Sequence, residues 1–383
     1  MRILYVALKF DYDNPDQGLS FEHCNFFDSL WRMGHDILYF DYGTLMRRLG
    51  RAAMNRRLVE VALAEKPDLM FTVLTADQVD FKAVRRITDS GATVTLNWFC
   101  DDHWRFDNYS RHWAPAFRWV VTTAQSAVPK YQEIGYANVI KSQWACNHHL
   151  YRKLDLPLKY DVTFIGQPHG NRGFIIDALL QTGIDVQVWG RGWDTGRLSQ
   201  EQMIEVFNQS RINLNLSNSS ATGKPPALPH RLRALAGRAL ARLPGGAKLR
   251  ARLRARFSWG ERVALAAGPE AALPEQIKGR NFEVPGCGGF LLSGNADDLP
   301  RYYEPGREID CFDGIPDLIA KVRHWLANDA GRGAVAEAGY RRTLGEHTYA
   351  HRFRDIFARL KLPGTELLPG DAAPRPGSCE EVN

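Results

Sequence analysis

The chain lacks any long hydrophobic run, because none of its apolar stretches approaches the ~20 consecutive residues that a transmembrane helix needs. The apolar stretch at its N-terminus, MRILYVALKF, is also too short for the hydrophobic region of a secretory signal, and Asp11 follows it directly. We therefore interpret Arg2–Leu8 as a first β-strand and expect any membrane contact to be peripheral.

Closely spaced cysteines are also absent. The six cysteines include no CxxC pair and have no histidine at zinc-finger spacing, which excludes the common structural zinc sites. Reduced thiols in a cytoplasmic protein explain this pattern most simply.

The length and composition indicate a globular protein with more than one domain. A single hydrophobic core rarely serves more than roughly 250 residues, and the chain has 383. Its hydrophobic content of 44% and charged content of 24% are typical of folded proteins. The net charge of +6 favours an anionic ligand, nucleic acid or membrane surface without choosing among them.

Short β-branched or aromatic segments alternate with helix-length segments in both halves of the chain. This alternation predicts an α/β fold of two doubly wound, Rossmann-like domains that face each other across a cleft. In Ser20–Met33, the clearest helix, Ser20 is the expected N-cap and Gly34 the stop. The expected strands are Arg2–Leu8, Asp36–Asp41, Leu69–Leu74, Thr93–Phe99, Val120–Thr123, Val139–Trp144, Asp161–Gly166, Val186–Gly190, Ile212–Ser217, Gly289–Ser293 and Ile309–Phe312.

A charged stretch that ends at Pro157 separates the two halves. We expect an N-terminal domain over residues 1–150, a C-terminal domain over 151–345 and a closing helix over 346–362. Residues 363–383 are rich in proline, glycine and acids, so we expect a disordered tail.

Residues 218–274 interrupt the second alternation and are the expected insertion. The part from His230 to Arg256 contains many arginines and no acid, and leucines at helical spacing precede and accompany them. We expect a basic helix over residues 228–256 that contacts an anionic membrane surface. A solvated, partly disordered loop is the alternative.

Ligands of doubly wound sheets bind beyond the carboxyl ends of the strands. After the strand that ends at Gly166, the loop carries His169, and a helix begins near Asn171. Gly166 allows close backbone approach, the helix N-terminus offers free N–H groups, and Arg172 adds a cation. These features suit a diphosphate, although an ordinary strand–turn–helix connection is the alternative.

The next two strands add weaker candidates. In VWGRGW, Gly190 and Trp193 are placed to hold a nucleobase, unless the tryptophan is simply buried. In SRINLNLS, Asn213 lies on the polar face of the strand, where it either contacts the ligand or caps the sheet.

The segment Gln276–Gly289 gives the strongest signal. Lys278 and Arg280 can neutralise a diphosphate, and Glu283 can accept hydrogen bonds from two ribose hydroxyls. The glycines that follow permit close backbone approach to a ligand.

Together these motifs resemble the CgeB/YkvP-like glycosyltransferases. The matching stretches are DVTFIGQPHGNR, VWGRGW, SRINLNLS, IKGRNFEVPGCGGFLL and HTYAHRF, and in the N-terminal half ILYVALKFDYDNPDQGLSFE and NWFCDDHWRFDNYSRHW. The resemblance implies a GT-B fold, a nucleotide-sugar donor held mainly by the C-terminal domain, no cofactor and no obligatory metal. It implies an enzyme that transfers a sugar to a hydroxyl of a glycan, a lipid-linked sugar or another acceptor.

Without a metal, the leaving diphosphate must be stabilised by cations and helix N-termini, for which Arg172, Lys278 and Arg280 are the candidates. Retaining relatives carry two glutamates separated by seven residues. Glu275 and Glu283 have this spacing, which favours retention, but the intervening QIKGRNF lacks the relatives' glycine-rich loop.

The acceptor hydroxyl needs a base or a hydrogen-bond acceptor within reach. Asp101, Asp102 and His103 follow the strand that ends at Phe99, so we expect them to face the cleft, and Glu22 competes for the role. The alternative is that the two aspartates cap the following segment.

Other functions remain open on the same fold. A nucleotide-sugar-binding protein or a GT-B-type epimerase without transferase activity is the first alternative. Nucleic-acid binding is disfavoured, because the arginines are confined to the insertion and lack interleaved aromatic residues. Asp11-Tyr-Asp13 fits the D-x-D form of metal-dependent glycosyltransferases, but we interpret it as a pair of loop acids.

Deletion of residues 228–256 tests the expected membrane helix. The deletion should abolish binding to vesicles that contain anionic lipid and leave donor binding unchanged, because only the insertion carries the clustered arginines. Vesicle co-sedimentation of the two proteins measures this, and equal binding by both would contradict the hypothesis.

Overall fold

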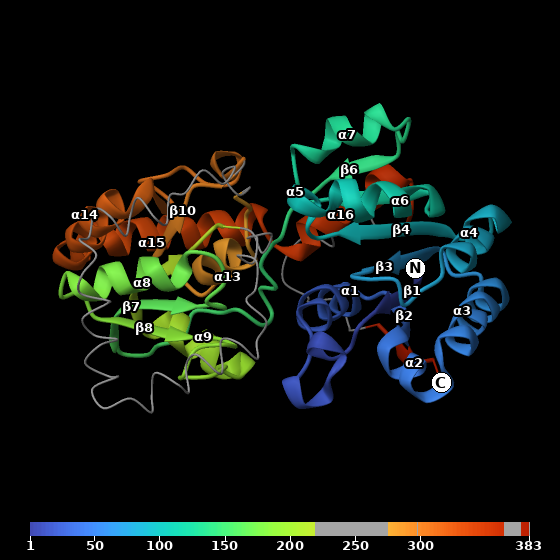
Figure 1. The fold of residues 1–383 in the computed structure, drawn as a ribbon, viewed down its shortest axis with the longest axis horizontal. Helices are drawn as coiled ribbons and strands as arrows, with labels where there is room; N and C mark the ends of the chain where they lie inside the picture. The colour runs from blue at the N-terminus through green and yellow to red at the C-terminus, as the bar shows by residue number, and fades with distance from the viewer. Residues whose placement is uncertain (219–274, 297, 364–376, 383) are drawn as a thin grey trace, which may run out of the picture.

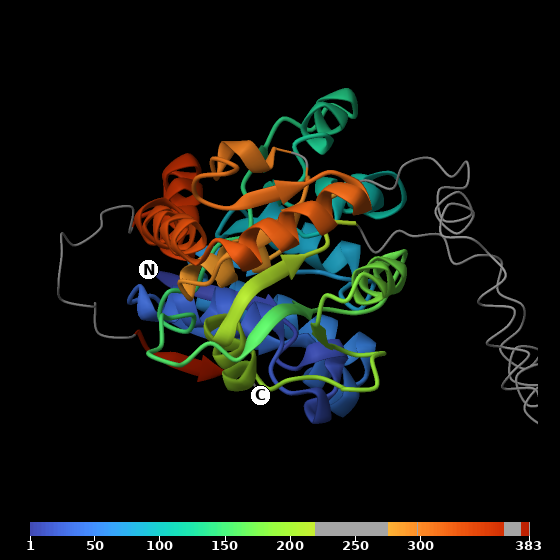
Figure 2. The same cartoon turned by 90° about the vertical axis from the view of Figure 1, so that its left-hand side faces the viewer.

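The computed structural model describes residues 1–218, 275–296, 298–363 and 377–382. They form two domains, each a parallel sheet flanked by helices (Figures 1 and 2), which confirms the predicted fold class. The N-terminal domain contains β1 Arg2–Ala7, α1 Asp28–Arg32, β2 Asp36–Asp41, α2 Tyr42–Leu49, α3 Arg51–Glu65, β3 Leu69–Thr72, α4 Phe81–Ser90, β4 Val94–Phe99, α5 Asp102–Arg105, α6 Arg111–Trp113, β5 Trp119–Thr122, α7 Ala127–Glu133 and β6 Val139–Lys141. The C-terminal domain contains β7 Tyr160–Ile165, α8 Arg172–Gln181, β8 Val186–Trp189, α9 Gln200–Gln209, β9 Ser210–Asn215, α13 Arg280–Gly286, β10 Leu291–Gly294, β11 Asp310–Phe312, α14 Gly314–Ala327 and α15 Asp329–Glu346.

The two sheets share one strand order. The order is β2-β1-β3-β4-β5 in the first sheet and β8-β7-β9-β10-β11 in the second, while β6 and β12 (Cys379–Glu381) extend the edges of the first. In both domains the chain reverses direction across the sheet beside the first strand, β1 or β7. The carboxyl ends of both sets of strands point toward the boundary between the domains (Figure 1), so the loops that bind ligands in such sheets meet there.

The helix that begins near Ser20 is present, but it is not uniformly α-helical. The Ser20 hydroxyl accepts a hydrogen bond from the backbone N–H of His23 at 3.0 Å, as expected of an N-cap. Residues 23–27 then form a π-helical turn before α1. Gly34 has a φ of 83°, a left-handed conformation that ends the helix at low cost.

The closing helix, α16 (Tyr349–Leu360), leaves the C-terminal domain and packs on the N-terminal sheet (Figure 1). Its Phe353 ring lies 6.0 Å from the Phe26 ring and 5.7 Å from the Phe71 ring, measured between centroids. One hydrophobic core therefore runs from Ile3 and Tyr5 to the residues of α13. The burial of α16 fixes the two domains against each other.

The expectation of a disordered tail over residues 363–383 is wrong for its final part. Residues 379–381 form β12, which pairs in parallel with β2. The backbone N–H of Ile37 donates to the Ser378 carbonyl at 2.9 Å, and Trp31 Nε1 donates to the Gly377 carbonyl at 2.5 Å. The edge of the sheet at β2 pairs with this segment, although the composition of the segment alone suggested disorder.

The expected basic insertion and the first part of the expected disordered tail fall outside the described residues. Residues 219–274 include nearly all of the expected basic insertion, so the membrane hypothesis stays a prediction. Among the residues that are described, no helix is long and apolar enough to cross a membrane.

Candidate functional site

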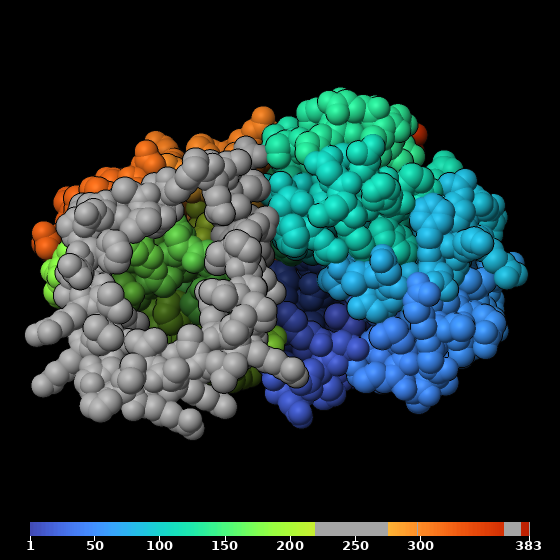
Figure 3. Space-filling model, viewed as in Figure 1, coloured from blue at the N-terminus to red at the C-terminus, as the bar shows by residue number. Residues whose placement is uncertain are grey.

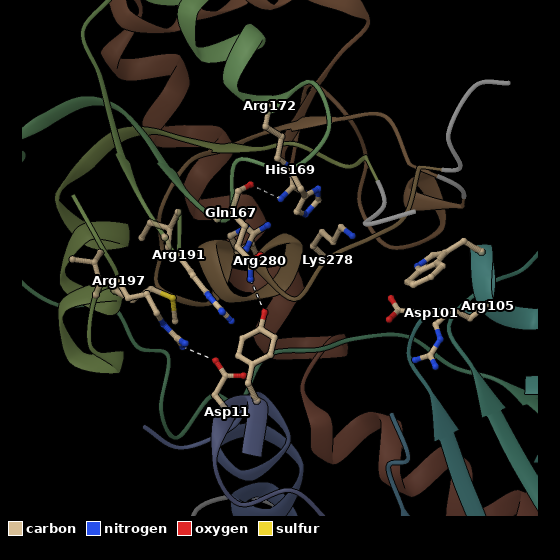
Figure 4. Close-up of a pocket in the computed structure, with 17 residues that line it drawn as sticks. Asp11, Asp101, Arg105, Gln167, His169, Arg172, Arg191, Arg197, Lys278 and Arg280 are labelled. Carbon is tan, nitrogen blue, oxygen red and sulfur yellow. Dashed lines mark hydrogen bonds and ion pairs between the residues drawn. The ribbon is translucent and has the colours of Figure 1, made fainter. Parts of the chain in front are cut away.

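The loops at the carboxyl ends of both sheets line a cavity of about 660 Å³. Figure 3 shows the two domains side by side, and Figure 4 shows the side chains that line the cavity. Six arginine or lysine side chains line it, against two carboxylates, so its charge is positive and suits an anionic ligand. The charged residues are Arg105, Arg172, Arg191, Arg197, Lys278, Arg280, Asp11 and Asp101.

Glycines bring two loops of the C-terminal domain together at the cavity. A Cβ atom on Gly190, whose φ is 146°, would lie 2.3 Å from the Gly166 carbonyl oxygen. Both glycines line the cavity, as predicted. Trp193 does not line the cavity. Its indole N–H instead donates to the Gly166 carbonyl at 2.6 Å, so the tryptophan stabilises the loop that contains Gly166.

Arg172 lines the cavity, but other residues of the chain engage its guanidinium. The group donates to the Gln167 carbonyl at 3.2 Å, the Leu216 carbonyl at 2.8 Å and Asn218 Oδ1 at 2.8 Å. Burial and the nearby Arg280 lower its pKa to about 9, so it remains charged at neutral pH. Arg172 therefore holds the ends of β7 and β9 in place while it adds positive charge to the cavity.

Lys278 and Arg280 are two basic side chains of the cavity that form no bond with the part of the chain that the structure describes. Within the described residues, no hydrogen bond or salt bridge reaches Lys278 Nζ or the Arg280 guanidinium. Burial and Arg172 lower the pKa of Lys278 to about 7, an effect that Asp101 opposes. Burial also lowers the pKa of Arg280. An anion placed here would satisfy both side chains.

His169 lines the same wall, as predicted. Its Nδ1 is buried without a hydrogen-bond partner in the described chain. Burial and three neighbouring cations, Arg172 first, lower its pKa to about 4, so the ring is neutral at pH 7 and can donate one hydrogen bond.

Glu283 lies behind this wall and does not line the cavity. It is buried, and its Oε1 accepts a hydrogen bond from the Tyr151 hydroxyl at 3.0 Å. Burial raises its pKa to about 7, although Arg280 acts in the opposite direction. Glu275 lines a separate pocket of about 150 Å³ with Asn171, so the two glutamates do not converge on one point.

On the N-terminal side, Asp101 lines the cavity, and Figure 4 shows the Lys278 side chain pointing toward it. Asp101 Oδ1 accepts a hydrogen bond from Gln276 Nε2 at 3.4 Å. Glu22 lies near Asp101 but is not part of the cavity lining. Burial raises the pKa of Glu22 to about 7, and repulsion by Asp11 and Asp101 adds to this effect.

Three more of the predicted site residues face away from the cavity, which corrects the sequence analysis. Asp102 is buried inside the N-terminal domain, where its Oδ2 accepts a hydrogen bond from the Tyr131 hydroxyl at 2.8 Å. Asn213 is buried and donates to the Phe207 carbonyl at 3.1 Å, so it has the structural role left open above. Asn171 bonds to Asn218 at 3.0 Å outside the cavity.

His103 is also absent from the cavity lining. Burial, followed by Lys278 and Lys141, lowers its pKa to about 4, so the ring is neutral at pH 7. Its Nδ1 finds no partner among the described residues.

Sequence reasoning missed a set of contacts that cross the cleft (Figure 4). Asp11 forms a salt bridge with Arg197 at 2.6 Å, and the Tyr12 hydroxyl accepts a hydrogen bond from Gln167 at 2.5 Å. The Arg191 guanidinium lies 5.0 Å from the centre of the Tyr12 ring. The arginines follow β8, so their position after a strand was the available signal, but the sequence did not show their partners.

The Asp11-Tyr-Asp13 motif agrees with its interpretation as a pair of loop acids. Asp13 pairs with Arg47 of its own domain, whereas Asp11 pairs across the cleft. Within the ranges that the structure describes, no group of three or more His, Cys, Asp or Glu side chains could hold a metal ion.

Comparisons with known proteins agree with this geometry. Residues 172–270 and 238–358 match the model of the family described as "Glycosyl transferase-like". Spore protein CgeB of Bacillus subtilis (strain 168) is 24% identical over 246 residues, which cover 63% of this chain and 66%, just under two thirds, of that protein. Over these residues the chain is similar to CgeB and to the glycosyltransferase-like family.

Solved structures of other proteins share its fold. Anabaena Alr3699/HepE in complex with UDP-glucose superposes with a TM-score of 0.60 at 11% identity, over 94% of this chain and 99% of that one. Sucrose-phosphate synthase from Thermosynechococcus elongatus gives a TM-score of 0.57 at 10% identity, over 93% and 99%. The chain therefore has the expected GT-B fold.

Replacement of Gly190 with alanine tests the loop contact on which the cavity wall depends. The added Cβ would meet the Gly166 carbonyl, so we expect Gly190→Ala to lower the free energy of unfolding by about 2 kcal/mol or more. Urea denaturation measures this loss.

Gly173→Ala is the matched control, because Gly173 lies in α8 and has open space around it. This change should raise the free energy of unfolding by about 0.5–1 kcal/mol. Equal effects of the two substitutions would contradict the proposed contact.

Proposed function

We propose that the protein transfers a sugar from a nucleotide-diphosphate sugar to an acceptor hydroxyl, independently of metal and with retention at the anomeric carbon. The observation that supports this most strongly is a pair of basic side chains, Lys278 and Arg280, in a positively charged cavity between two domains, where no described residue forms a hydrogen bond or salt bridge with either of them. UDP-sugars are the first donors to test, because the structurally similar Anabaena protein was solved with UDP-glucose.

In the proposed reaction, the bond between the anomeric carbon and the distal phosphate oxygen breaks. The acceptor oxygen forms a new bond to that carbon, and its proton passes to a carboxylate or to the departing phosphate. Negative charge develops on the diphosphate as it leaves. Lys278 and Arg280 offset this charge in a site that is partly shielded from water, where electrostatic stabilisation is strongest.

The proposed acceptor of the hydroxyl proton is Asp101. It lies on the N-terminal wall and faces the cation pair, so an acceptor hydroxyl between the two walls can reach both the carboxylate and the donor. Glu22 is the second candidate, because a pKa near 7 suits a general base but its carboxylate lies outside the cavity lining.

Retention at the anomeric carbon is a separate part of the proposal. It rests on the seven-residue spacing of Glu275 and Glu283. Glu275 lines the smaller pocket of about 150 Å³, and Glu283 is buried beside Tyr151. The spacing in sequence therefore does not bring the two carboxylates to one place in the structure. NMR assignment of the product anomer decides this part of the proposal.

Replacement of Lys278 with alanine tests the donor site. We expect Lys278→Ala to weaken UDP binding by about 10- to 100-fold, the usual cost of one charged hydrogen bond. Isothermal titration calorimetry measures the Kd. Lys130→Ala is the control, because Lys130 pairs with Asp107 on the surface of the N-terminal domain and should leave the Kd unchanged. A Kd unaffected by either change would remove the main support for the proposal.

The proposed base is tested by Asp101→Asn. We expect kcat for transfer to fall by about 10²–10⁴-fold while the Kd for UDP changes little, because the substitution removes the proton acceptor but keeps the shape. Asp102→Asn should retain kcat in the folded protein, since Asp102 lies outside the cavity. If Glu22→Gln causes the large loss and Asp101→Asn does not, the assignment is wrong.

A further inference from the structure

A second cavity of about 580 Å³ opens on the N-terminal domain. It is formed by the start of α3, the loop from β3 to α4, and the end of α6. None of its lining residues belongs to the donor cavity.

The two cavities lie at opposite ends of one helical segment, residues 102–113. Trp104 and Arg105 line the first cavity, and His112 and Trp113 line the second. Trp113 follows Arg105 by eight positions, which corresponds to about 12 Å along a helix. Figure 1 shows α5 at the cleft and α6 farther along the same surface, beside α4.

Hydrogen bonds tie this segment to the loop after β3. Arg105 Nη1 donates to the Thr75 carbonyl at 2.8 Å, and the Tyr109 hydroxyl donates to the Ala76 carbonyl at 3.1 Å. Trp113 Nε1 donates to Asp77 Oδ1 at 3.1 Å. These hydrogen bonds hold the segment between the two cavities against the loop after β3. A ligand that spans both cavities would therefore bind to a segment that is already ordered.

The second cavity is lined by two aromatic rings and by polar side chains. The Phe81 ring lies 6.0 Å from the Trp113 ring and is exposed, since 40% of the residue's surface is accessible. Around these rings stand Asp77, an acceptor, and Lys82 and His112, which are exposed donors.

This combination selects among ligand classes. An acyl chain would cover the rim groups without offering them hydrogen bonds, which is costly. The carboxylates of Asp77 and Asp80 offset the charges of Arg51 and Lys82, so the lining does not favour an anion such as phosphate. A pyranose sugar presents an apolar C–H face to an aromatic ring and hydroxyls, both donors and acceptors, at its edge.

We propose that the Phe81–Trp113 pocket is a second saccharide subsite, which binds one unit of an oligosaccharide acceptor whose reacting hydroxyl lies beside Asp101. This inference rests on the proposed function, since it takes the donor cavity as the place of transfer. The acceptor is then an extended neutral glycan that follows residues 102–113, rather than a monosaccharide.

The test uses the full chain and three neutral probes: cellohexaose, maltohexaose and chitohexaose. Saturation-transfer NMR and calorimetry should detect at least one of them, and Phe81→Ala should weaken its binding by about tenfold, the size of one aromatic contact. The Kd for UDP, measured on the same samples, should not change. Leu180→Ala, which truncates an exposed side chain on α8 of the other domain, should affect neither ligand.

A second variant guards against misfolding of Phe81→Ala. Lys82→Ala changes an exposed side chain at the rim and should weaken the same hexasaccharide by about fivefold, as expected for one hydrogen bond. Thermal unfolding checks that both variants are folded.

The outcomes separate the two claims. If none of the hexasaccharides binds, or if both folded variants bind the probe as the unmodified chain does, the subsite inference is wrong even when UDP binds. Binding to phosphatidylglycerol vesicles that Phe81→Ala abolishes would also overturn it, in favour of a lipid surface. If a hexasaccharide binds in the expected way and UDP does not, the proposed transfer function fails while the saccharide pocket stands.

Discussion

Positive charge in a partly buried cleft is the constraint on which the site depends. Burying a cation is costly unless a counter-charge accompanies it, and the described chain provides little for Lys278 and Arg280. Arg172 lies beside them, but its guanidinium already donates hydrogen bonds to the carbonyl groups of Gln167 and Leu216 in the loops that shape the cavity. The folded protein therefore holds a place for a multiply charged anion, whose binding would relieve the repulsion. A nucleotide diphosphate has the required charge.

The rest of the architecture maintains this arrangement. Helix α16 returns to the N-terminal domain, and its Phe353 packs in a core that continues into α13, the helix that carries Arg280. At the mouth of the cleft, the Asp11–Arg197 salt bridge and the Tyr12–Gln167 hydrogen bond join the same two domains. A donor bound to the C-terminal wall is thus held opposite Asp101 on the N-terminal wall.

The sequence was informative where local chemistry decides the outcome. Strand–helix alternation predicted both sheets, and the residues of the loops after β7 and β8, such as Gly166 and Gly190, were found at the cavity. It was less informative where orientation decides. Asp101 and Asp102 are adjacent, but one faces the cleft and the other bonds to Tyr131, a difference that no local pattern encodes. Likewise, the partners of Arg197 and of β12 come from distant parts of the chain.

The central claim is that Lys278 binds the diphosphate of the donor. The number of protons that the protein takes up when UDP binds tests this claim most directly. With a pKa of about 7, Lys278 is mostly neutral at pH 7.5, and a bound diphosphate should raise that pKa. Titration of UDP at pH 7.5 in buffers of different ionisation enthalpy should show a net uptake of protons on binding, which should be smaller in Lys278→Arg. UDP binding with the same proton change in both proteins would contradict the account.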